Sequence, residues 1–339
     1  MRKVLCYLVL TALCVILIWR LTEGGNGDAE ARFPVPNVIL MDEDGEDAAE
    51  KSGGAAPEFG DIALDALYSP CAALVDVESG QILAEKNGDE KMYPASMTKL
   101  MAALVAVEHT QDWSGTIEIP QEIFAALYAA HASLAGFEPG EKVTPEDLLY
   151  GMLLPSGAEC CTVYAAWLAG DEETFVEWMN EKAAELGMEH THFCNTTGLH
   201  DDGHYSTAED MAVLMRECLK NETLRRALMT KEYRTGALAG HPDGLVMEST
   251  LFQAIEGSED LAGMLEKAER AGAALLGGKT GYTSQAGLCL ASFGRAGGRE
   301  YVLVTAGAEG NHNTEPFHVE DALAVYAQPG GKSETGQEK

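Results

Sequence analysis

The chain has 339 residues, of which 46% are apolar and 7% aromatic, a composition typical of a globular protein with one large domain or two modest ones. Its 54 acidic residues outnumber its 23 lysines and arginines, so the formal net charge is −31. Because neutralisation of phosphates by cationic side chains dominates the affinity for nucleic acids, this charge excludes nucleic acid as an expected partner.

The first 21 residues have the pattern of a membrane-targeting segment. Arg2 and Lys3 precede an apolar run from Val4 to Trp19, slightly shorter than the roughly 20 residues that cross a bilayer. No cleavage site with small residues follows closely, so we expect an uncleaved N-terminal anchor, with a cleaved signal peptide as the alternative. An anchor would hold the rest of the chain at the extracytoplasmic face of the cell membrane, and cleavage would release it as a secreted protein.

Residues 22–57 are rich in glycine, alanine, aspartate and glutamate and show little periodicity. Such a composition cannot bury enough apolar surface to fold, so we expect a disordered acidic linker. The folded domain is expected to span residues 58–328, and residues 329–339 are expected to form a polar tail.

The first predicted elements of the domain are a β-hairpin over 71–87 and a helix over 94–109. Thr144 followed by Pro145 is a signal for a helix start, with the threonine as N-cap. Helices are predicted over 144–154, 158–170, 171–187 and 206–221, with a long polar loop over 190–207.

Near the C-terminus we predict one strand over 275–295, a second over 299–309 and a final helix over 315–328. Strands and helices do not alternate, which argues against a doubly wound parallel sheet. We expect an α+β fold, in which strands from both chain ends form an antiparallel sheet flanked by helices, with an all-helical subdomain inserted.

The residues that commonly bind metals do not form a recognisable site. The eight cysteines show no C-x-x-C spacing, and we expect those in apolar segments to be small buried hydrophobic side chains. A metallopeptidase would use histidines of the polar loop, but these lie on no H-E-x-x-H helix. The four histidines of that loop are His190, His192, His200 and His204. We therefore expect no metal and no cofactor.

The first of three short motifs is Ser96-Met97-Thr98-Lys99, at the start of the predicted helix over 94–109. The i, i+3 spacing places Ser96 and Lys99 on one face. A serine hydroxyl is a weak nucleophile, and a lysine with a depressed pKa can serve as its base. The alternative is that Ser96 only caps the first turn.

The second motif, Lys279-Thr280-Gly281, lies in a predicted strand. A lysine in an apolar strand is expected to be paired or functional, and it can attract the carboxylate of an extended peptide bound along the strand. The alternative is an exposed strand lysine.

The third motif, Ser156-Gly157-Ala158, follows a helix that breaks at Pro155. The break would hold Ser156 on a short loop. The alternative is an ordinary turn, in which Ser156 is the N-cap of the next helix and Glu159 its capping-box partner.

The order and spacing of the three motifs resemble those of the penicillin-binding D-alanyl-D-alanine carboxypeptidases, low-molecular-mass serine peptidases that share the fold of the class A β-lactamases. The resemblance covers about residues 59–328. It implies a β-lactamase/transpeptidase-like fold and a reaction that removes the terminal D-alanine from peptidoglycan stem peptides ending in D-Ala-D-Ala. It also implies inhibition by β-lactams.

The resemblance implies roles for individual residues. Ser96 would be the acylated nucleophile, Lys99 its general base, and Ser156 a proton relay between Lys99 and the leaving amine. The backbone N–H groups of Ser96 and Tyr282 would form the oxyanion hole. Lys279 and Thr280 would hold the substrate carboxylate.

Two other residues, Gly281 and Thr283, complete the substrate-binding set that the resemblance implies.

The chain departs from the family at Ala158, where an asparagine is usual. The amide of that asparagine would touch both the lysine and the substrate carbonyl. Exported members often carry a C-terminal β-rich domain and an amphipathic anchoring helix. Since the sequence ends soon after Gln328, we expect attachment through the N-terminal helix instead.

Two other functions stay open at this point. The loss of the asparagine is compatible with a penicillin-binding pseudoenzyme or a peptidoglycan-binding sensor. A β-lactamase would need a deacylating glutamate on a loop ahead of the substrate strand, whereas Glu138 and Glu141 precede the middle motif.

Overall fold

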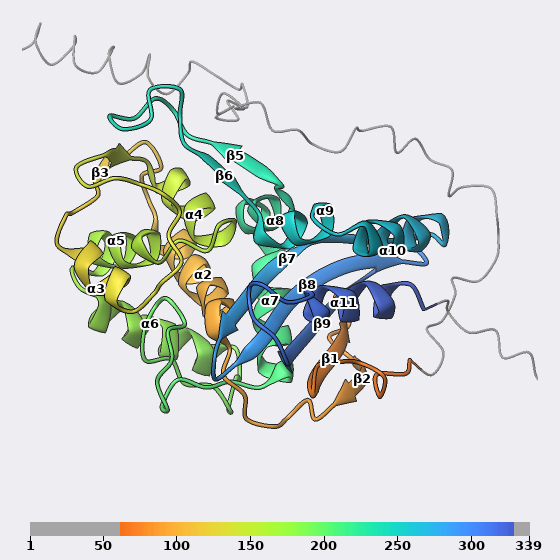
Figure 1. Cartoon of the computed structure of the whole chain (residues 1–339). Helices are drawn as coiled ribbons and strands as arrows, with labels where there is room; N and C mark the ends of the chain where they lie inside the picture. Colours follow the sequence, from red (N-terminus) through yellow and green to blue (C-terminus); the bar gives the residue numbers. More distant parts are fainter. Residues whose placement is uncertain (1–61, 329–339) are drawn as a thin grey trace, which may run out of the picture. The chain divides into compact units, whose positions relative to one another are not determined.

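The computed structural model describes residues 62–328, and within this range five antiparallel strands form the main sheet (Figure 1). Their order across the sheet is β2 (Ile82–Lys86), β1 (Cys71–Asp76), β9 (Arg299–Ala308), β8 (Gly287–Ala296) and β7 (Ala273–Thr283). Strands from the two ends of the domain thus lie side by side, where β1 pairs with β9. The expected antiparallel sheet is confirmed.

The segment predicted as one strand over 275–295 is two strands, and that prediction is wrong. It turns back between Thr283 and Gly287, so that β7 and β8 pair as a hairpin. The Thr283 hydroxyl accepts a hydrogen bond from the Ala286 N–H at 3.0 Å, and Gly287 adopts a φ of +67°, which glycine tolerates best. The turn leaves the K-T-G motif on β7, the edge strand of the sheet.

Each face of the sheet packs against its own helices. One face contacts α9 (Thr250–Glu256), α10 (Glu259–Arg270) and α11 (Phe317–Tyr326), and the other contacts α7 (Ala208–Lys220) and α8 (Glu222–Met229). Because successive residues of a strand point to opposite faces, Leu290 joins the core under α11, whereas Ala291 joins the core under α7.

A second set of helices forms the expected helical subdomain beside β7 (Figure 1). It comprises α2 (Lys99–His109), α3 (Ile123–Ala129), α4 (Pro145–Leu153), α5 (Ala158–Ala169) and α6 (Glu172–Glu185). The short 3-10 helix η2 (Ala95–Thr98) leads into α2. Two small sheets, β3 (Ile117–Glu118) with β4 (Lys142–Val143) and β5 (Glu232–Arg234) with β6 (Val246–Glu248), lie on the same side.

The helix starts follow the predicted capping signals. The Thr144 side chain accepts a hydrogen bond from the Asp147 N–H, and the Asp147 carboxylate accepts one from the Thr144 N–H, so α4 begins with a capping box and Pro145. Within the helix predicted over 206–221, the Thr207 side chain is the N-cap of α7 and accepts a hydrogen bond from the Asp210 N–H at 3.1 Å.

The predictions for the chain ends lie outside the described residues, since the anchor at 1–21, the linker at 22–57 and the tail at 329–339 all fall there. Within residues 62–328, no helix has both the length and the apolar character that a membrane span requires. Of the cysteines in this range, Cys194 is partly exposed and the others are buried, as expected for small hydrophobic side chains.

Candidate active site

Ser96 and Lys99 face each other at the junction of η2 and α2. The Lys99 ammonium nitrogen lies 2.8 Å from the Ser96 Oγ and 2.7 Å from the carbonyl oxygen of Thr197. Lys99 is only 2% exposed, and this burial lowers the pKa of its amine. A lysine that loses its proton readily beside a serine hydroxyl has the properties of a general base.

Two glycines bring other backbone segments against the Ser96 turn. A Cβ on Gly198 would lie 1.8 Å from the Ala95 carbonyl oxygen, and a Cβ on Gly281 would lie 3.0 Å from the Ser96 nitrogen. Ala95 itself adopts a φ of +46°, an unfavourable conformation for a residue with a side chain. The backbone around the serine is therefore held in an uncommon shape by its neighbours.

Lys279 lies on β7 and is 1% exposed, which excludes the alternative of an exposed strand lysine. Its amine donates to the Ser156 Oγ at 3.0 Å and to the Thr280 carbonyl oxygen at 2.9 Å. Burial, and secondarily the charge of Lys99, hold the pKa of Lys279 well below its ordinary value. A carboxylate bound nearby would favour the charged form of this lysine.

Ser156 lies between α4 and α5 with a φ of +68° and a buried side chain. The alternative in which it caps α5 is wrong, because Gly157 is the N-cap and no side chain caps that helix. The Glu159 carboxylate, instead of completing a capping box, accepts hydrogen bonds from the Ala135 and Gly136 N–H groups. The Ser156 hydroxyl therefore bonds to Lys279 and lines the hollow beside it.

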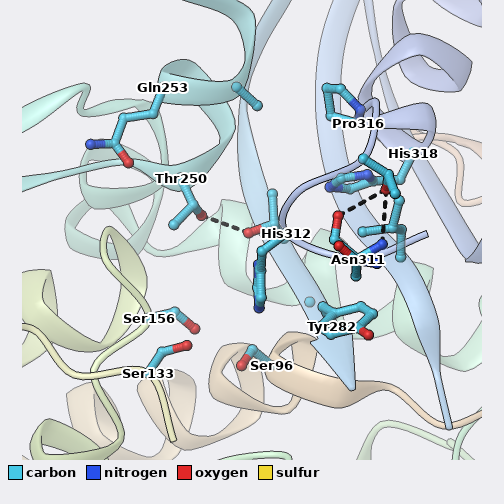
Figure 2. Close-up of a pocket in the computed structure, with 15 residues that line it drawn as sticks. Ser96, Ser133, Ser156, Thr250, Gln253, Tyr282, Asn311, His312, Pro316 and His318 are labelled. Atoms are coloured by element: carbon cyan, nitrogen blue, oxygen red, sulfur yellow. Dashed lines mark hydrogen bonds between the residues drawn. The ribbon is translucent and has the colours of Figure 1, made fainter. Parts of the chain in front are cut away.

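A hollow between β7 and the helical subdomain is lined by the predicted residues Ser96, Ser156, Thr280, Gly281 and Tyr282 (Figure 2). Lys279 is buried behind Ser156 and lines neither this hollow nor the one that adjoins it. The Thr280 hydroxyl lies 2.6 Å from that of Thr250, at the start of α9. A second hollow adjoins the first and reaches Lys99. Thr283 lines this second hollow, and its hydroxyl holds the β7–β8 turn.

Several lining residues, among them Ser133, Thr250 and His312, were absent from the sequence prediction. Each of these three lies in a loop or at a helix start without a recognisable motif, so its position depends on tertiary packing. The His312 ring stacks edge-on against Tyr282, with ring centroids 4.8 Å apart. These residues extend the hollow from the predicted serines toward the β9–α11 loop (Figure 2).

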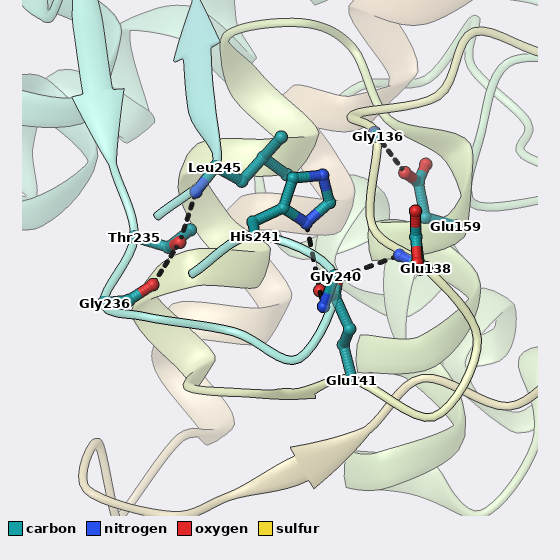
Figure 3. Close-up of polar contacts among 9 residues, drawn as sticks. All are labelled: Gly136, Glu138, Glu141, Glu159, Thr235, Gly236, Gly240, His241 and Leu245. Carbon is teal, nitrogen blue, oxygen red and sulfur yellow. Dashed lines mark hydrogen bonds and ion pairs between the residues drawn. The ribbon is translucent and has the colours of Figure 1, made fainter. Parts of the chain in front are cut away.

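The glutamates considered for a β-lactamase do not line either hollow. Glu141 is 1% exposed; its carboxylate accepts hydrogen bonds from the Glu138 and Gly240 N–H groups and contacts His241 (Figure 3). Although burial opposes ionisation, these bonds keep the pKa of Glu141 below its ordinary value. Glu141 thus joins the β5–β6 hairpin to the loop before α4.

The histidines considered for metal binding hold the 190–207 loop in place. The His204 ring nitrogens contact the Thr98 hydroxyl at 2.7 Å and the Cys194 N–H at 3.1 Å. Burial lowers the pKa of His204 to about 4, so the ring is neutral at pH 7. Within residues 62–328, no three histidine, cysteine, aspartate or glutamate side chains are arranged to hold a metal ion.

A family model described as D-alanyl-D-alanine carboxypeptidase matches residues 61–310, well over half of the chain. The chain belongs to this family. D-alanyl-D-alanine carboxypeptidase DacF of Bacillus subtilis is 34% identical over 241 residues, which are 70% of this chain and 57% of that protein. The chain therefore spans little more than half the length of this relative. DacB2 of Mycobacterium tuberculosis is 32% identical, over 68% of this chain and 72% of that protein.

Solved structures confirm the expected fold. The crystal structure of the Streptomyces K15 DD-transpeptidase has a TM-score of 0.65 and 24% identity, covering 77% of this chain and 97% of that one. A D-alanyl-D-alanine carboxypeptidase from Mycobacterium tuberculosis has a TM-score of 0.62 and 24% identity, covering 76% of this chain and 90% of that one. The five-stranded sheet and the helical subdomain of this family member thus form the DD-peptidase fold.

Proposed function

We propose that the protein is a serine-type D-Ala-D-Ala carboxypeptidase that trims peptidoglycan stem peptides through an acyl-enzyme on Ser96. The observation that carries this proposal is the buried lysine 2.8 Å from the serine hydroxyl, beside a second buried lysine on the edge strand. Family membership and the relatives' names support the substrate class.

In the acylation step, Lys99 accepts the Ser96 proton while the Oγ attacks the carbonyl carbon of the penultimate D-alanine. The N–H groups of Ser96 and Tyr282 stabilise the oxyanion. The C–N bond then breaks, and the leaving amine takes a proton from the Ser156 hydroxyl, which regains one from Lys99. Lys279 donates a hydrogen bond to Ser156, so the serine's own proton is free for transfer.

In the deacylation step, Lys99 accepts a proton from water, and the resulting hydroxide attacks the acyl carbon. The bond to the Ser96 Oγ breaks, and this oxygen recovers its proton from Lys99. Before acylation, the carboxylate of the terminal D-alanine binds along the 279–283 end of β7, near Lys279 and Thr280. β-Lactams stop the cycle at the acyl stage because they present a similar carbonyl and carboxylate.

The proposal is tested by D-alanine release from an acyl-L-Lys-D-Ala-D-Ala tripeptide, with the wild-type protein and Ser96→Ala compared. We expect release by the wild type and none by the variant. Penicillin labelling of Ser96 without D-alanine release would favour the second candidate, a penicillin-binding pseudoenzyme or sensor, which the alanine at position 158 supports.

We further propose that residues 1–21 anchor the protein at the extracytoplasmic face of the membrane, on the support of their charge and apolar pattern. Fractionation of cells that express the full chain tests this location. The protein should be found with membranes and should be accessible to protease added outside the cytoplasmic membrane. Recovery in the cytoplasm would contradict it.

A further inference from the structure

The wall of the site opposite β7 carries Ala158, at the position where an asparagine is usual in the family. Ala158 lines the second hollow together with Ser96 and Lys99, and its methyl group can form no hydrogen bond with a substrate. Lys99 already donates to the Ser96 Oγ and the Thr197 carbonyl. The contact that Ala158 leaves open is therefore one to the substrate.

The loop over 130–136 covers this part of the wall. The Ser133 carbonyl oxygen accepts a hydrogen bond from the Ala158 N–H at 2.8 Å. The fully buried Glu159 carboxylate accepts from the Ala135 N–H at 2.6 Å and the Gly136 N–H at 3.1 Å. The C-terminal end of the Ser156-Gly157-Ala158 turn is thus fastened to the loop that carries Ser133, through Ala158 and the adjacent Glu159.

Gly157 makes the approach of this loop possible. A Cβ at Gly157 would lie 2.7 Å from the Ala135 Cβ and 2.9 Å from the Ala135 nitrogen, both too close for a side chain. The loop therefore packs directly on the backbone of the turn, and the position of Ser133 is set by this packing and by the hydrogen bonds.

The Ser133 side chain faces the reacting groups. It lines both hollows, and its hydroxyl points into the same space as those of Ser96 and Ser156 (Figure 2). The Ser156 hydroxyl is bonded to Lys279, whereas no residue in the range 62–328 forms a hydrogen bond with the Ser133 Oγ. Ser133 is also exposed, so a bound ligand can reach its hydroxyl.

We propose that Ser133 is a substrate-contact residue, whose hydroxyl donates to the substrate carbonyl oxygen on the acyl side and so supplies the contact missing at Ala158. This inference rests on the proposed carboxypeptidase function. The single donor hydrogen of a hydroxyl is enough for this contact, and Lys99 keeps its present partners, the Ser96 Oγ and the Thr197 carbonyl oxygen.

The test measures D-alanine release with Ser133→Ala, Ser133→Thr, Ala158→Asn and the double variant Ser133→Ala/Ala158→Asn. We expect Ser133→Ala to lower kcat/KM about tenfold, as the loss of one hydrogen bond predicts, and Ser133→Thr to retain most of it. Ala158→Asn should restore the activity of Ser133→Ala, because the amide returns the donor. Ser114→Ala, an exposed serine outside the site, is the control and should leave the rate unchanged.

A second measurement does not depend on turnover. Calorimetric binding of the same tripeptide to Ser96→Ala and to Ser96→Ala/Ser133→Ala gives the contact alone, and we expect Kd to rise about tenfold with the second change. If the wild type releases no D-alanine but Kd rises in this way, the carboxypeptidase proposal fails and the Ser133 contact stands. An unchanged Kd, or an unchanged kcat/KM in Ser133→Ala, overturns the inference.

Discussion

The two walls of the candidate site are held together by different kinds of contact. The sheet wall, formed by η2, β7 and the 195–199 loop, depends on backbones that approach closely at Gly198 and Gly281. The helical wall, formed by the 156–158 turn and the 130–136 loop, combines a close approach at Gly157 with hydrogen bonds to one buried carboxylate, that of Glu159. Ala158 is bound to this loop through its backbone N–H, so its side chain can change without the loss of that contact.

This difference explains where the chain departs from its family. The residues expected on the sheet wall, Ser96, Lys99 and Lys279, are all present. The departure, Ala158, lies on the helical wall, where a neighbouring loop carries a hydroxyl into the same space (Figure 2). We expect the sheet wall to carry the nucleophile and its base, and the helical wall to carry the Ser156 proton relay and the substrate contact of Ser133. Four changes test this division.

The largest effect is expected on the sheet wall for Lys99→Met, which removes the base but keeps a long apolar side chain. The rate of penicillin acylation should fall about a thousandfold, the order expected for the loss of a general base. In the wild type, acylation should slow as pH falls, because Lys99 must lose its proton to act and acid restores that proton. Stopped-flow labelling measures both, and Lys267→Met, at an exposed position of α10, should behave as wild type.

The next largest effect is expected for Gly198→Ala. The new Cβ would meet the Ala95 carbonyl oxygen, so we expect a loss of more than about 3 kcal/mol in the free energy of unfolding, together with loss of labelling. Gly187→Ala is a matched control, because Gly187 also has a positive φ but no atom lies within 4 Å of its Cβ position. Gly187→Ala should lower the free energy of unfolding by about 1–2 kcal/mol, the cost of a positive φ alone. Urea denaturation measures both variants, and equal losses would show that the close approach at Gly198 is unimportant.

A smaller effect is expected on the helical wall for Glu159→Ala. The Ala135 N–H loses its acceptor, which should cost about 1–3 kcal/mol and loosen the loop that carries Ser133. Glu159→Gln keeps an acceptor oxygen and should retain the fold. Retention of wild-type stability by the alanine variant would contradict the role given to this carboxylate.

The wild type and Glu159→Gln should also differ in how their stability depends on pH. Burial raises the pKa of Glu159 above its ordinary value of 4.5, so the folded chain binds this proton more tightly than the unfolded chain. The resulting stability is complete below pH 4.5 and is lost as pH rises through the folded pKa. Glu159→Gln should therefore lack this loss, which thermal unfolding between pH 4 and pH 8 would reveal.

The smallest effect is expected for His241→Ala, which removes the ring that contacts the Glu141 carboxylate (Figure 3). Glu141 would lose its 3.0 Å contact with the ring but keep the N–H donors of Glu138 and Gly240. We expect a change of about 1 kcal/mol or less in stability and no change in the acylation rate. A large change in the acylation rate would contradict this expectation and would show that the β5–β6 hairpin contributes to the helical wall.

The sequence predicted the parts of this structure that depend on local patterns. The N-cap at Thr144 and the first hairpin follow from short-range signals, and the three motifs carry the family resemblance. The strand over 275–295 was predicted too long, because its apolar residues continue on both sides of a turn that a single hydroxyl and Gly287 create.

The contacts made by the site residues were less predictable. The partner of Ser156 is Lys279, 123 positions away, and Ser133 reaches the site only because Glu159 and Gly157 fasten its loop to the turn. Such placements depend on tertiary packing and leave no periodic pattern in the sequence. The lowered pKa of Lys99, in contrast, was expected from its motif, and burial supplies its cause.

The most direct test of the central claim, that the sheet wall carries the nucleophile, is the site of acylation by benzylpenicillin. Peptide mapping by mass spectrometry of the treated full chain should find one penicilloyl adduct, on the peptide that contains Ser96, and Ser96→Ala should show none. An adduct on Ser133 or Ser156, or no adduct on the wild type, would contradict the account.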